Sequence, residues 1–140
     1  MKDQLTFEFI VELFAQCLTS KTFAELVSQH LKYEFLPTEA TKIVYKDICD
    51  TLELEDKLTT IGNISQRNNS NKEVIEFLKK VKNVKFINQK EELLTTLEAY
   101  IKESMFVQLH EEVTAKYNKD EHSDAIHMLA IRSAEIQEFS

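Results

Sequence analysis

The chain has 140 residues, of which 43% are hydrophobic and 29% charged, and its formal net charge is −7. These values are typical of one soluble domain with a sizeable core, and they argue against disorder and against a duplex-binding surface spread over the whole fold. The single glycine and single proline exclude glycine loops that bind phosphate and favour helices over sheets.

Hydrophobic periodicity predicts a series of short helices in the first part of the chain. Thr22 and Glu25 have the form of a capping box, and Asn71 can cap the helix that follows it. Gly62 is expected to interrupt the weakest of these elements. The predicted helices cover roughly residues 5–18, 22–31, 38–52 and 54–67, with a fifth after Asn71.

From Asn88 to Ser140 the sequence predicts two long helices joined by one polar turn, Tyr117–Glu121. Asn88 stands three residues before Glu91 and can cap the first of them. That helix would be about 45 Å long, which is too long to lie within so small a core. We therefore expect an all-α fold, in which a small helical globular bundle (1–87) precedes a long projecting helical hairpin (88–140).

The hairpin carries more apolar residues than one helix pair can cover. The simplest interpretation is that its two helices bury their stripes against each other. Because several of these residues are consecutive, we expect a second apolar face that packs on another protomer. The residues predicted to support self-association are Leu97, Ile101, Met105, Leu109, Val113, Ile126, Leu129, Ile136 and Phe139.

The sequence offers no arrangement that points to catalysis. His110-Glu111-Glu112 lacks the second histidine that a helical zinc motif needs. Cys17 and Cys49 lie in apolar helical runs, where free cysteine behaves as a small hydrophobe. We expect a non-enzymatic chain with no catalytic, cofactor-binding or metal-binding residues.

One segment, Lys72–Lys90, is basic, with six lysines against two glutamates. The ordinary interpretation is a solvated face near a helix end, where cations are favourable. The alternative is a contact for an acidic partner or a nucleic-acid backbone, which would make the chain a small helical nucleic-acid-binding or regulatory protein. Its contact residues would be Lys79, Lys80, Lys82 and Lys85.

We expect neither a targeting segment nor a membrane span in this chain. Its start, Met1-Lys2-Asp3-Gln4, mixes charges, and no run approaches the roughly 20 apolar residues of a membrane span. We expect a cytoplasmic protein without membrane partners.

Four segments together carry a likeness to a known family: His30–Leu36, Thr41–Ile48, Leu58–Ile61 and Thr96–Ile101. They resemble the N-terminal domain of bacterial hexameric replicative DNA helicases of the DnaB type. The order of elements is similar from about residue 9 to residue 140. The family's Glu-Ala-Glu near the first helix and Gly-Gly before the fifth are absent.

This resemblance implies a function in DNA replication. The ATPase motor, with its ATP and Mg²⁺, would lie outside this chain, and the chain would contribute to the collar of the ring. Hairpins would pair into dimers that assemble as a trimer of dimers. The collar would dock primase or a helicase loader and meet DNA only indirectly.

Overall fold

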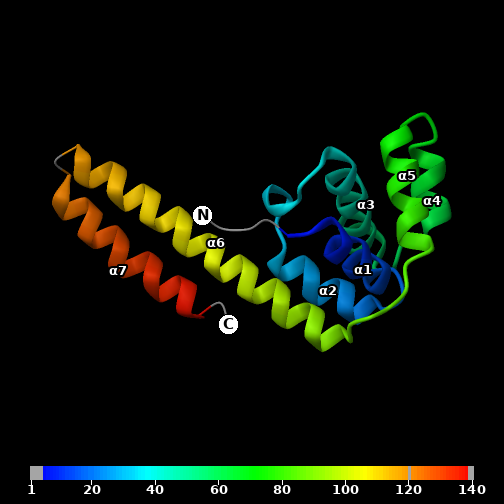
Figure 1. The fold of residues 1–140 in the computed structure, drawn as a ribbon, viewed down its shortest axis with the longest axis horizontal. Helices are drawn as coiled ribbons and strands as arrows, with labels where there is room; N and C mark the ends of the chain where they lie inside the picture. The colour runs from blue at the N-terminus through cyan, green and yellow to red at the C-terminus, as the bar shows by residue number, and fades with distance from the viewer. Residues whose placement is uncertain (1–4, 120, 139–140) are drawn as a thin grey trace. The chain divides into compact units, whose positions relative to one another are not determined.

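The computed structural model describes residues 5–119 and 121–138. This part of the chain contains seven α-helices, one short 3-10 helix and no β-strand (Figure 1), which confirms the predicted all-α fold. It divides into two compact units, residues 5–94 and residues 95–138. The assignment of residues 88–140 to self-association stays a prediction.

The first unit contains five helices, a 3-10 turn and the start of a sixth helix. Most of the predicted elements appear within a few residues of their expected ends. The bounds are α1 Phe7–Cys17, α2 Lys21–His30, η1 Tyr33–Phe35, α3 Glu39–Glu55, α4 Ile61–Arg67 and α5 Lys72–Lys82, followed by α6 from Lys90.

A side-chain oxygen caps the start of each of the first five α-helices and accepts a backbone N–H three residues on. Asn71 caps α5 as predicted, at 3.2 Å from the nitrogen of Val74. The predicted capping box at Thr22 is wrong, because Ser20 accepts the N–H of Phe23 and α2 begins at Lys21. The other caps are Thr6, Thr38 and Thr60.

The predicted interruption at Gly62 is also wrong. Gly62 is the second residue of α4 and has no positive φ. The chain bends earlier, where α3 ends at Glu55 and Asp56 takes the left-handed conformation with φ 51°. An aspartate tolerates this conformation better than most residues, so it ends the helix without glycine.

Aromatic side chains form the centre of the core. Phe14 stacks on Tyr45 with ring centroids 5.7 Å apart and meets Phe77 edge-on at 5.6 Å, which joins α1, α3 and α5. The buried Tyr45 hydroxyl donates to the carbonyl of Leu31 at 2.6 Å. The Leu31 carbonyl lies just past the end of α2, where backbone carbonyls have no partner within the helix, and this hydrogen bond satisfies it.

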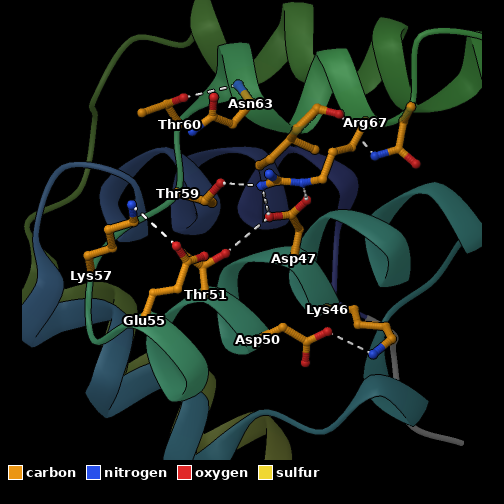
Figure 2. A network of polar contacts seen from close by, with 12 residues as sticks. Lys46, Asp47, Asp50, Thr51, Glu55, Lys57, Thr59, Thr60, Asn63 and Arg67 are labelled. Carbon is orange, nitrogen blue, oxygen red and sulfur yellow. Dashed lines mark hydrogen bonds and ion pairs between the residues drawn. The ribbon is translucent and has the colours of Figure 1, made fainter.

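A polar network fixes α4 against α3 (Figure 2). Arg67 donates two hydrogen bonds to the Asp47 carboxylate, at 2.9 and 2.7 Å, and a third to Thr59 at 3.0 Å. The hydrogen bonds to Asp47 raise the pKa of the Arg67 guanidinium above its ordinary value. The bidentate geometry restrains direction as well as distance, so α4 is held in one orientation.

A buried carboxylate anchors the segment that leads into α6. Glu12 is 5% exposed and accepts from the backbone nitrogens of Ile87 at 2.6 Å and Asn88 at 2.8 Å. It also accepts from the side-chain amide of Asn88 at 2.8 Å. The predicted cap at Asn88 and Glu91 is wrong, because α6 begins at Lys90 and Gln89, not Asn88, directly precedes it. The N–H of Gln89 is instead accepted by Glu92 at 3.1 Å.

Burial acts to raise the pKa of the Glu12 carboxyl, but the hydrogen bonds from Asn88 and Ile87 outweigh it, and the pKa lies below its ordinary value. A carboxyl whose folded-state pKa is lowered contributes stability at pH values above its unfolded pKa, about 4.3. That contribution is lost as the pH falls through the folded-state pKa.

We predict that Glu12→Gln lowers the free energy of unfolding by about 1–3 kcal/mol at pH 7, because a neutral amide replaces a carboxylate that accepts three hydrogen bonds. The difference from the wild type should shrink as the pH falls below about 4. Urea unfolding at pH 7 and pH 3, followed by circular dichroism, measures both effects. Glu8→Gln, at an exposed position of α1, is the control, and an equal loss at both pH values would contradict the prediction.

Candidate interaction surface

The second unit contains the hairpin, in which α6 (Lys90–Asn118) turns into α7 (His122–Glu138). The N–H of Glu121 donates to the carbonyl of Lys116 at 2.9 Å, and the side chains of these two residues form an ion pair at 3.3 Å. Tyr117 stacks on His122 with ring centroids 4.0 Å apart. The turn is therefore closed by contacts between the helix ends; Asp120, within it, lies outside the described residues.

The two helices run side by side and antiparallel (Figure 1). Arg132 on α7 donates to Glu112 on α6 at 2.6 Å. Leu109, Ala125 and Ile136 are almost fully buried and mark the faces along which the helices meet. The contact covers only part of α6, since α7 has 17 residues against 29 in α6.

The residues predicted to support self-association do not form one surface. Four of them are buried within the chain, namely Leu97, Ile101, Leu109 and Ile136. Met105 and Val113 are half-buried. Ile126 and Leu129 are exposed, and Phe139 lies outside the described residues.

Four exposed apolar residues and the half-buried Val113 form a separate face. At about 100° per residue, Phe106, Val113 and Tyr117 share a stripe of α6 that lies beside the stripe of Leu109. Ile126 and Leu129 share a stripe of α7 beside that of Ala125. Because the helices are antiparallel and both right-handed, these two stripes emerge on the same side of the pair.

We name this surface the apolar hairpin face and define it as Phe106, Val113, Tyr117, Ile126 and Leu129. Phe106 is 43% exposed, Tyr117 55%, Ile126 66% and Leu129 47%. Phe106 and Tyr117 were not among the predicted interface residues. The consecutive apolar residues Met105-Phe106-Val107 were the signal for a second face, but periodicity alone did not show which members α7 covers.

The opposite side of the hairpin is acidic. By the same helical geometry Glu111 of α6 and Asp124 and Glu135 of α7 lie on that side. Ile131 also faces away from the apolar hairpin face and is 47% exposed. One side of the hairpin therefore carries the two apolar stripes, and the opposite side carries several carboxylates.

The four predicted contact lysines of the basic segment are divided between two hollows of the first unit. Lys79 and Lys82 line one hollow between α4 and α5. Lys80 and Lys85 line another beside α1, and the Lys80 ammonium lies 4.8 Å from the centre of the Phe7 ring. This division does not favour a single continuous track for a nucleic-acid backbone.

Within the part of the chain that the structure describes, no group of three or more histidine, cysteine or acidic residues is placed to hold a metal ion. Cys17 and Cys49 are free thiols, and burial raises the pKa of both. Across residues 5–119 and 121–138, no helix combines the length and apolar character needed to cross a membrane.

Comparison with protein-family models, with curated proteins and with solved structures found no match to this chain. The geometry of the hairpin and of the helical unit therefore carries the functional argument.

We predict that Leu109→Ala and Ile126→Ala differ sharply in their effect on the hairpin of a single chain. Removing the buried Leu109 side chain should leave a cavity that costs about 2–4 kcal/mol, whereas the exposed Ile126 should cost less than about 0.5 kcal/mol. Amide hydrogen exchange of α6 and α7, measured at low protein concentration, should accelerate about 30-fold or more in the first variant only. Comparable acceleration in both would show that Ile126 is buried.

Proposed function

We propose that this chain is a non-catalytic assembly domain that associates with a second copy of itself through the apolar hairpin face. The observation that carries the proposal is the exposure of Phe106, Tyr117, Ile126 and Leu129 on one side of a two-helix hairpin. Several exposed apolar side chains on one side of a helix pair are typical of a protein interface.

The limited packing within the hairpin supports this proposal. Because α7 has 17 residues against 29 in α6, it covers only part of α6, and a pair of helices with so limited a contact needs further burial to be stable. A second hairpin laid on the apolar hairpin face supplies a four-helix arrangement with a central core. The face would then be isologous, with the same residues contributed by both copies.

The distribution of charge favours a second copy on this side. A chain with a net charge of −7 repels its own copies most strongly where carboxylates meet. Glu111, Asp124 and Glu135 lie on the other side, so pairing through the apolar hairpin face keeps these three carboxylates away from the contact.

We further propose that the assembly is the collar of a replicative DNA helicase of the DnaB type. Support comes from the resemblance of residues 30–36, 41–48, 58–61 and 96–101 to the N-terminal domain of that family, together with the order of a helical globule and a hairpin. Hairpin pairing would then build dimers, and primase or a loader would dock on the collar. A Walker A motif encoded beyond Ser140 in the gene would support this proposal; a continuous reading frame of unrelated sequence would oppose it.

We predict that the chain forms dimers at micromolar concentration and that Ile126→Asp weakens them at least 10-fold. In an isologous interface each copy contributes the new carboxylate, so two charges are buried per dimer. Light scattering coupled to size-exclusion chromatography, over a range of concentrations, measures the molar mass. Circular dichroism should show unchanged helicity.

Ile131→Asp is the matched control, because it makes the same substitution at an exposed isoleucine on the other side of α7. This variant should dimerise like the wild type. A strictly monomeric wild type at concentrations up to hundreds of micromolar would refute self-association, and equal weakening by both substitutions would refute the assigned face.

A further inference from the structure

The groove between α4 and α5 differs in character from the other hollows of the first unit. Its volume is about 430 Å³, and aliphatic residues of both helices line it, with Ile61 from α4 and Ile75 and Leu78 from α5. Lys79 and Lys82 stand at its edge. The surface is therefore apolar at the base and cationic at the rim.

The only glycine of the chain, Gly62, also lines this groove. Its φ is not positive, and a Cβ added there would come no closer to another residue than 3.8 Å, at the Oγ1 of Thr60. Neither the backbone conformation nor the packing within the chain requires glycine here. Glycine is a poor helix former, so the feature it provides is an open stretch of backbone that another molecule can approach closely.

The two lysines are available to a ligand. In the described residues neither Lys79 nor Lys82 takes part in an ion pair. The acidic residues of α5, Glu73 and Glu76, lie instead beside another hollow, with Lys80. The rim thus keeps a positive charge in a chain that is acidic as a whole.

The groove is held in shape before any ligand arrives. The bidentate contact of Arg67 with Asp47 and the cap that Thr60 provides to Asn63 at 3.0 Å both fix α4 (Figure 2). A preformed groove loses little conformational entropy when it is filled.

We propose that the α4–α5 groove binds an acidic amphipathic helical segment of a partner protein. Apolar side chains of that segment, three and four residues apart, would enter the groove over Gly62, and its flanking carboxylates would pair with Lys79 and Lys82. A nucleic acid fits less well, because the residues that line the groove include no aromatic ring on which a base could stack.

The test uses the ¹⁵N-labelled chain and a synthetic helical peptide of about 16 residues, with leucines on one face and glutamates on both flanks. Amide shifts should change at residues 61–65 and 75–82. Gly62→Leu, which fills the groove, should weaken binding at least 10-fold. Gly62→Ala should fold as well as the wild type or better, which separates loss of binding from loss of structure.

Charge is tested with two double variants of equal net charge. Lys79→Glu with Lys82→Glu should weaken binding at least 10-fold, whereas Lys80→Glu with Lys85→Glu, which alters the other hollow, should leave it within about twofold. A peptide with lysines in place of the glutamates should not perturb the groove.

The proposal is overturned if the acidic peptide causes no shifts at millimolar concentration, or if Gly62→Leu binds it like the wild type. It is also overturned if both double variants bind equally. Groove shifts with a single-stranded oligonucleotide but not with the peptide would assign the site to nucleic acid. The hairpin variants Ile126→Asp and Ile131→Asp should bind the peptide normally, so this proposal and self-association succeed or fail separately.

Discussion

The buried Glu12 carboxylate is the contact on which the organisation of the first unit depends. It joins α1 to Ile87 and Asn88, which are 75 and 76 positions later in the sequence. An unpaired carboxylate at this depth would be strongly destabilising, so the charge is tolerated only because three donors converge on it. Those donors belong to the last irregular segment before α6, and the long helix therefore begins at a defined place in the helical unit.

Most of the helical unit could be predicted from the sequence because its signals are local. Apolar spacing marked the helices, and Asn71 was recognisable as a cap. The errors arose where two local signals compete. Ser20 and Thr22 are both good capping residues, and only the packing of Phe23 and Ala24 decides between them. Asn88 was predicted to cap a helix, yet its side chain donates to Glu12, a partner that no local pattern could indicate.

The interface was harder to predict than the fold, for a physical reason. A helix with apolar residues on several sides has no single apolar stripe. Periodicity then shows that these residues need to be buried, but it does not show which neighbouring helix or chain buries each of them. The turn contacts and the ion pair of Arg132 with Glu112 set the rotation of α7 against α6. Once that rotation is known, Leu109 is assigned to the inside of the pair and Phe106 to the outside, although they are only three residues apart.

Charge distinguishes the apolar hairpin face from the α4–α5 groove. The apolar hairpin face consists of apolar side chains, while Glu111, Asp124 and Glu135 lie on the opposite side of the hairpin, which favours the first side for the proposed contact between copies of an acidic chain. The α4–α5 groove has the opposite bias, because Lys79 and Lys82 flank an aliphatic base. The apolar hairpin face therefore suits a second copy, and the groove suits an acidic partner. Under these two proposals, one chain carries a surface of different character for each occupant.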